Sequence, residues 1–140
     1  MKYGIYYAYW EKEWNGDYKY YIDKISKLGF DILEISCGAF SDYYTKDQEL
    51  IDIGKYAKEK GVTLTAGYGP HFNESLSSSE PNTQKQAISF WKETLRKLKL
   101  MDIHIVGGAL YGYWPVDYSK PFDKKRDLEN SIKNMKIISQ

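Results

Sequence analysis

Aromatic side chains follow the first strand that the sequence predicts, in the segment Tyr-Tyr-Ala-Tyr-Trp-Glu at residues 6–11. Ligands of parallel α/β sheets bind at the carboxyl ends of the strands, which is where this segment falls. Flat rings suit the apolar C–H faces of a neutral ligand such as a sugar. The segment has no glycine pattern that would hold a phosphate at a helix N-terminus. It therefore favours a sugar-like ligand over a nucleotide.

Glycines and aromatic residues also share the ends of the third and fourth predicted strands, at residues 66–70 and 107–115. Glycine lets a ligand or a second backbone approach closely, while Tyr68 and Trp114 supply rings for a lid or floor. The alternative is that the glycines only form turns and the rings only pack. Recurrence of the pattern at three strand ends favours a ligand site.

The titratable residues outside these segments give weaker indications. His71 and His104 have no metal-ligand spacing; His71 falls in a long loop, and His104 opens the fourth strand, away from the predicted site. Glu34 ends the second strand run on the correct side. A hydrogen-bonded structural carboxylate is the more common reading, and an acid or base is the alternative; Glu34 has no carboxylate partner in the sequence. Cys37 is predicted to be a buried small hydrophobe.

Four β-rich runs, each followed by a helical pattern, must position these residues. The strands are predicted at 3–7, 32–36, 62–66 and 103–106, and the helices at 17–28, 47–60, 83–100 and from about 124 to the end. Asp17, Thr45 and Asn82 are the expected N-caps, and Gly29 and Gly61 stand at helix C-termini. This alternation predicts an α/β fold with parallel strands, either an open doubly wound sheet or a closed barrel. Four strands cannot close a barrel, which takes eight, so the chain is expected to need another half.

Composition excludes several classes of partner. Twenty basic and nineteen acidic residues leave a net charge of +1, and no basic run can follow a phosphate backbone, so we expect no nucleic-acid partner. The sequence shows neither a signal peptide nor a long apolar run, which predicts no membrane partner and a cytoplasmic location. The single cysteine fits a reducing compartment.

Four segments, 1–14, 27–34, 64–70 and 102–117, together resemble the ketose 3-epimerases, especially D-psicose (D-allulose) and D-tagatose 3-epimerases. The resemblance implies the first four βα units of a (βα)8 TIM barrel of the xylose isomerase-like type. Residues 1–140 would form its N-terminal half, with the C-terminal half absent. It also implies that Tyr6 contacts the ketose with Ala109 beside it, that Trp14 and Trp114 shield the distal end of the sugar, and that Gly67 lies on the same wall.

In that family a divalent metal, Mn²⁺ or Co²⁺ or else Mg²⁺, binds the ketose oxygens while two glutamates remove and return the C3 proton of an enediolate. The resemblance places these ligands and glutamates on strands five to eight. We therefore expect no catalytic residue, metal ligand or bound metal in this chain, and a homo-oligomer for the full-length form.

The first hypothesis is that the chain is the N-terminal portion of an isomerase that interconverts ketohexoses at C3. Its substrate pairs would be D-fructose with D-psicose and D-tagatose with D-sorbose, and the 140-residue chain alone is expected to be inactive. The alternative is a half-barrel that binds sugar or self-associates without catalysis. A flavodoxin-like nucleotide-binding sheet is disfavoured because the sequence has no phosphate loop.

Overall fold

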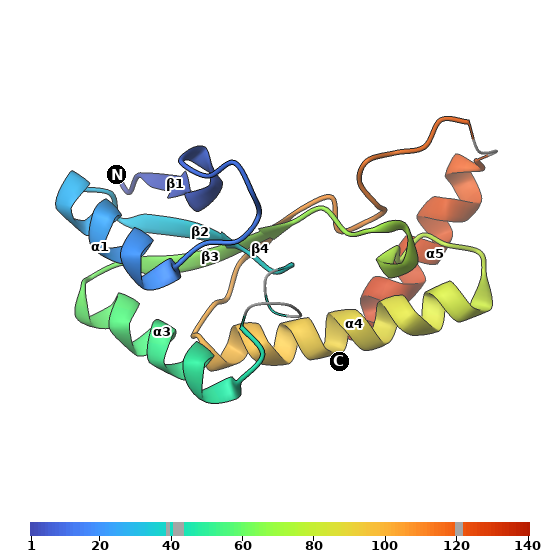
Figure 1. Ribbon diagram of the computed structural model, residues 1–140. Coiled ribbons are helices and arrows are strands. Elements are labelled where there is room, and N and C mark those ends of the chain that lie inside the picture. The colour runs from blue at the N-terminus through green and yellow to red at the C-terminus, as the bar shows by residue number, and fades with distance from the viewer. Residues whose placement is uncertain (39, 41–43, 120–121) are drawn as a thin grey trace. The chain divides into compact units, whose positions relative to one another are not determined.

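In the part of the chain that the structure describes, four short strands and four α-helices alternate, and the strands form one sheet in the order β1-β2-β3-β4 (Figure 1). The computed structural model describes residues 1–38, 40, 44–119 and 122–140. The strands are β1 (Gly4–Tyr6), β2 (Ile32–Ser36), β3 (Thr63–Tyr68) and β4 (Val106–Gly108). β1 pairs with β2 in parallel, as β2 does with β3, which confirms the α/β fold and its sequential strand order.

The helices are α1 (Tyr18–Leu28), α3 (Asp47–Glu59), α4 (Pro81–Leu100) and α5 (Lys124–Ile138). Two short 3-10 turns, η1 (Tyr7–Tyr9) and η2 (Phe72–Glu74), follow β1 and β3. None of the helices in the described part of the chain is long and apolar enough to cross a bilayer.

Local sequence accounts for the ends of α1. The Asp17 side chain accepts hydrogen bonds from the backbone N–H groups of Lys19 and Tyr20, as predicted for an N-cap. Gly29 ends the helix with φ of 81°, a left-handed conformation that glycine adopts without strain.

Two of the predicted N-caps are wrong. The N-cap of α3 is Lys46 and not Thr45, and its side chain makes no capping hydrogen bond. Asp47 and Glu49 in the first turn instead interact favourably with the positive end of the helix dipole. α4 begins at Pro81, so Asn82 lies inside the helix; proline suits the first turn because its missing N–H has no partner there.

The chain divides into two compact units. The first comprises residues 1–67 and 96–106, and the second comprises residues 68–95 and 107–140. β1, β2, α1, α3 and most of β3 belong to the first unit, whereas α5 and most of α4 belong to the second. Each unit is described on its own below.

The core of the first unit lies on one face of its strands. Alternate residues Leu33, Ile35, Leu64 and Ala66 are buried, as are the apolar stripes of α1 and α3, whose members include Ile22, Ile25, Leu50 and Ile53. α1 contacts both β2 and α3. Because side chains alternate along a strand, Tyr6, Glu34 and Ser36 fall on the opposite face of the sheet.

In the second unit, α5 packs through polar side chains. Asn130 donates to the carbonyls of Ser77 and Ser78, and the buried Asn134 donates to that of Leu76 at 2.8 Å. Three apolar residues of α5, Leu128, Ile132 and Met135, are exposed instead, whereas Ile137 and Ile138 at its end are half-buried. This helix therefore presents an apolar stripe away from its own unit.

The fourth strand lies later than predicted, at Val106–Gly108 rather than 103–106. Ile103 instead donates its N–H to the carbonyl of Leu98, which holds it in the connection after α4, where Asp102 has φ of 60°. His104 consequently lies before β4 and not in it, with an exposed ring 2.9 Å from Asp102.

Candidate functional site

Tyr6 and Trp14 lie together at the carboxyl end of β1. Tyr6 is the last residue of this strand, and its ring centroid is 6.2 Å from that of Trp14. The Tyr7 hydroxyl donates to the Trp14 carbonyl at 2.7 Å, which fixes the backbone of Trp14 while its indole stays 68% exposed. The loop thus places an accessible indole beside the half-buried Tyr6 ring.

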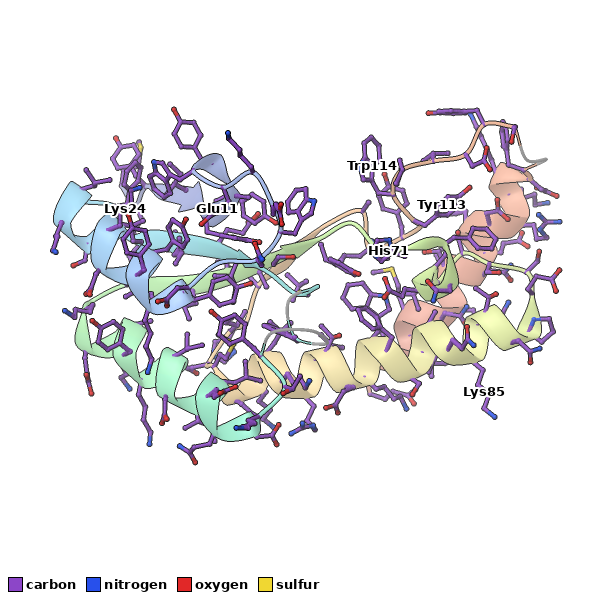
Figure 2. The ribbon with its side chains drawn as sticks, in the orientation of Figure 1. Glu11, Lys24, His71, Lys85, Tyr113 and Trp114 are labelled. Atoms are coloured by element: carbon purple, nitrogen blue, oxygen red, sulfur yellow. The ribbon has the colours of Figure 1, made fainter. Side chains whose placement is uncertain are left out.

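Two other rings of the first aromatic segment are used mainly for packing, whereas Tyr9 is exposed. Tyr7 is fully buried, and Trp10 stacks on Tyr21 of α1 with centroids 5.8 Å apart. The Lys24 ammonium lies 4.4 Å from the Trp10 ring centroid, a cation–π contact (Figure 2 labels Lys24 and Glu11). Of the predicted aromatic wall, Tyr6 is the ring that meets Trp14.

Gly67 and Glu34 lie close to Tyr6 on the same face of the sheet. Tyr6 pairs in register with Glu34, and Ser36 pairs with Gly67. Burial raises the pKa of the Tyr6 hydroxyl; a hydrogen bond with the Ser36 side chain lowers it, and the Glu34 charge raises it again. The net increase keeps Tyr6 a neutral hydroxyl, able to donate and to accept, throughout the neutral pH range.

Ala109 and Trp114 belong to the second unit, where both are tied to the end of β3. The Ala109 N–H donates to the Tyr68 carbonyl at 3.1 Å, and the Trp114 N–H donates to the Pro70 carbonyl at 2.7 Å. A Cβ on Gly69 would stand 3.0 Å from the Trp114 Cβ, so glycine at 69 allows this close approach. The Trp114 side chain, which Figure 2 labels, is 63% exposed and lies on the loop after β4.

The structure therefore brings the predicted sugar-binding residues together in two groups. In the first unit, Tyr6 and Trp14 lie side by side, and Gly67 lies two strands away from Tyr6 on the same face of the sheet; in the second unit, Ala109 and Trp114 hold to one segment. Tyr6, Gly67 and Ala109 lie at or next to strand ends, and Trp14 and Trp114 stand in the loops that follow. Their role in binding a sugar stays a prediction.

Glu74 organises the loop after β3, and no pattern in the sequence singles it out. Its carboxylate accepts a 2.8 Å hydrogen bond from the Tyr68 hydroxyl and a 2.7 Å bond from the His71 N–H. The Tyr68 ring packs against Phe90 and the buried Trp91, with centroids 5.6 and 6.1 Å apart. Tyr68 is thus a packed, anchored ring, and His71 is exposed as predicted.

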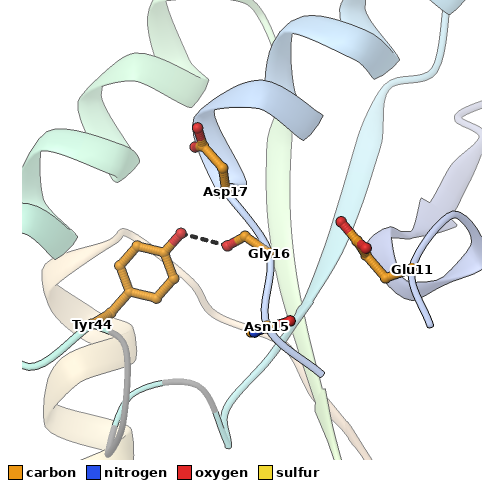
Figure 3. A pocket seen from close by; sticks show the side chains of 5 residues that line it. All are labelled: Glu11, Asn15, Gly16, Asp17 and Tyr44. Carbon is orange, nitrogen blue, oxygen red and sulfur yellow. Dashed lines mark hydrogen bonds between the residues drawn. The ribbon is translucent and has the colours of Figure 1, made fainter. Parts of the chain in front are cut away.

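A polar hollow of about 480 Å³ opens in the first unit, lined by Glu11, Asn15, Gly16, Asp17 and Tyr44 (Figure 3). The Tyr44 hydroxyl donates to the Gly16 carbonyl at 2.6 Å. Glu11 accepts from the Tyr21 hydroxyl, and Asp17 caps α1. One carboxylate oxygen of each acidic residue in the hollow is therefore already used within the fold. The sequence signal was the polar run that ends at Asp17, while Tyr44 arrives from a distant segment.

A metal of the kind the resemblance implies does not fit the residues in hand. Within residues 1–38, 40, 44–119 and 122–140, no group of three or more His, Cys, Asp or Glu side chains is placed to hold a metal ion. Cys37 is buried, as predicted, and burial above all raises the pKa of its thiol to about 12. A neutral thiol is a poor metal ligand.

Comparisons with known proteins agree with the fold. No family model matches the chain. It is 55% identical over all 140 residues to D-psicose 3-epimerase of Enterocloster bolteae and covers 46% of that enzyme. It is 47% identical, again over its whole length, to D-psicose 3-epimerase of Ruminiclostridium cellulolyticum, of which it covers 47%. The chain thus spans about half the length of the curated relatives it matches.

Solved structures give the same picture. D-psicose 3-epimerase with D-tagatose from Clostridium cellulolyticum H10 superposes with a TM-score of 0.94 at 47% identity, covering 99% of this chain and 47% of that one. A second D-psicose 3-epimerase, determined in the presence of D-fructose, has a TM-score of 0.90 at 44% identity, covering 96% and 46%. These matches resolve the choice between an open sheet and a barrel. The chain is homologous to the N-terminal half of the D-psicose 3-epimerases, and its four βα units are the first four of their TIM barrel.

Proposed function

We propose that this chain is the sugar-lining N-terminal half of a ketose 3-epimerase, an isomerase that moves a proton at C3 of ketohexoses. D-fructose with D-psicose and D-tagatose with D-sorbose are the proposed pairs. The observation that carries the proposal is 55% identity to a D-psicose 3-epimerase along the whole chain. The grouping of Tyr6, Trp14 and Gly67 at the strand ends supports it.

The residues of the first group supply three complementary features for a sugar. Tyr6 offers a neutral hydroxyl, since its pKa is raised mainly by burial. Trp14 offers an exposed apolar indole face for the C–H groups of the ketose. Gly67 adds no side chain of its own to the wall. Together they would shield the end of the sugar that does not react, which excludes water and orients the reacting carbons.

Metal binding, assembly and location form the remaining part of the proposal. We propose that Mn²⁺, Co²⁺ or Mg²⁺ is held by the other half of the barrel, that the complete protein is a homo-oligomer, and that it works in the cytoplasm. A single, buried cysteine is compatible with a reducing compartment.

A half-barrel exchange tests the function. Residues 1–140 would replace the matching half of the Enterocloster bolteae enzyme, and conversion of D-fructose to D-psicose would be measured with added Mn²⁺. The 55% identity leads us to expect an active chimera. The parent enzyme and the parent lacking that half serve as controls. A folded chimera that fails to epimerise D-fructose, D-psicose, D-tagatose and D-sorbose would overturn the proposal.

A further inference from the structure

Glu34 is a carboxylate that borders the proposed sugar wall of the first unit. It lies in the middle of β2 and pairs in register with Tyr6 on β1 and with Thr65 on β3. Paired residues of parallel strands share a face, so Glu34 projects from the face opposite the buried Leu33 and Ile35. That is the face on which Tyr6 lies.

Gly67 allows the Glu34 carboxylate to reach the carboxyl end of the sheet. A Cβ built on Gly67 would stand 2.7 Å from Glu34 Oε1 and 3.2 Å from its Cδ, closer than real Cβ atoms approach a neighbour. The carboxylate therefore occupies the space that a side chain at position 67 would fill. In this way Glu34, from the middle of β2, contributes its charged end to the wall formed by the carboxyl end of β3.

The oxygens of the Glu34 carboxylate can still accept hydrogen bonds. Glu34 is half-buried, and among the described residues no donor makes a hydrogen bond to it. Burial is the main cause that raises the pKa of Tyr6 and of Cys37. The charge of Glu34 raises both pKa values further, as expected for a carboxylate near both groups. A purely structural carboxylate is normally held by hydrogen bonds, and a half-buried one without them has a strong incentive to accept from a ligand.

We propose that Glu34 is a further substrate-binding residue, which accepts a hydrogen bond from a hydroxyl group on the non-reacting part of the ketose. This inference rests on the proposed function. A carboxylate accepts from a hydroxyl only where that hydroxyl points at it, so Glu34 makes the wall sensitive to hydroxyl configuration. D-fructose and D-tagatose differ only in the configuration of the C4 hydroxyl, and Glu34 helps to distinguish such a pair.

The test introduces Glu34→Gln into the half-barrel chimera and measures kcat and KM for D-fructose and for D-tagatose. Loss of a charge-assisted hydrogen bond raises KM for the preferred ketose about tenfold, with a smaller change in kcat, and narrows the difference between the two sugars. Glu59→Gln is the matched control, because Glu59 is exposed and ends α3 just before the amino end of β3. Glu34→Asp, which keeps the charge, recovers part of the lost affinity.

The outcomes separate the two proposals. An inactive chimera that carries Glu34 removes the proposed function and this inference with it. An active chimera in which Glu34→Gln leaves both KM values unchanged, or lowers only the melting temperature, shows that Glu34 is a structural carboxylate and overturns the inference alone. If Glu34→Gln fails to fold, the KM values of Glu34→Asp decide, since retraction of the charge by one methylene must still weaken binding of the preferred ketose.

Discussion

The contact between Gly67 and Glu34 makes a stability prediction that needs no substrate. In Gly67→Ala, the new Cβ would meet Glu34 Oε1 at 2.7 Å, so the carboxylate or the strand must move. Because Glu34 Oε1 is the end of a flexible side chain that can turn aside, we expect only a small loss, about 1 kcal/mol, in the free energy of unfolding, measured by urea denaturation of the chain. Glu34→Ala in the same molecule should relieve the conflict and recover part of that loss. Equal stability of Gly67→Ala and the parent chain would show that the contact exerts no constraint.

Cys37 provides a second residue-scale prediction, on reactivity. Its side chain is 1% exposed, and burial is the main cause that raises its pKa to about 12. Because thiolate is the nucleophile, the folded chain at pH 8 should react with a thiol reagent far more slowly than the urea-unfolded chain, which has an ordinary thiol pKa. The reaction rate, followed by absorbance with and without urea, checks this. Similar rates in both states would mean that Cys37 is accessible in the folded chain.

At the scale of single residues, the ends of the predicted strands are the signal in the sequence that points to the segments of the candidate site. Tyr6 ends β1 and Gly67 is the last residue but one of β3; strand ends pointed to their segments, and the family resemblance to the two residues. Trp14 stands in a loop, and its place depends on a hydrogen bond from Tyr7 that no local pattern encodes. Glu34 was noticed, but its reach depends on the missing side chain of Gly67, 33 residues further along the chain.

The caps of α1 and α3 give an element-scale prediction with a built-in control. Asp17 accepts two backbone hydrogen bonds at the start of α1, so Asp17→Ala should cost about 1 kcal/mol of stability. Thr45, which sequence reasoning took for the cap of α3, is exposed and followed by the observed N-cap Lys46. Thr45→Ala should therefore leave stability nearly unchanged. Thermal unfolding of both variants tests the pair, and equal losses would contradict the observed caps.

Elements with strong local signals were the ones that the sequence predicted well. β2 has its predicted bounds, because the run Ile32–Ser36 is compatible with a strand and follows a helix that Gly29 terminates. β4 was placed too early because Ile103 and Ile105 suggested a strand, whereas tertiary contacts assign it to Val106 and two glycines. Glycine has a low strand propensity, so its pairing here reflects the neighbouring strand and not its own preference. The barrel itself followed from the family resemblance, since four βα units fit both architectures.

At the scale of the whole molecule, unpaired surfaces predict how the 140-residue chain behaves alone. β1 and β4 stand at the ends of the sheet in the described part of the chain, and α5 exposes Leu128, Ile132 and Met135. Open strand edges and a continuous apolar stripe both promote pairing with another copy. We expect the purified chain to self-associate as its concentration rises, which sedimentation velocity measures.

Ile132→Glu isolates the contribution of α5 to that association. Ile132 is 48% exposed, and α5 is held within its unit by Asn130 and Asn134, so the charge should not release the helix. The substitution removes the centre of the apolar stripe and should shift association to higher concentration, with the circular dichroism spectrum unchanged. Ser139→Glu adds the same charge at an exposed position beyond the helix and should have little effect. If both variants shift association equally, net charge and not the apolar stripe governs it; if neither does, the strand edges are the contact between copies.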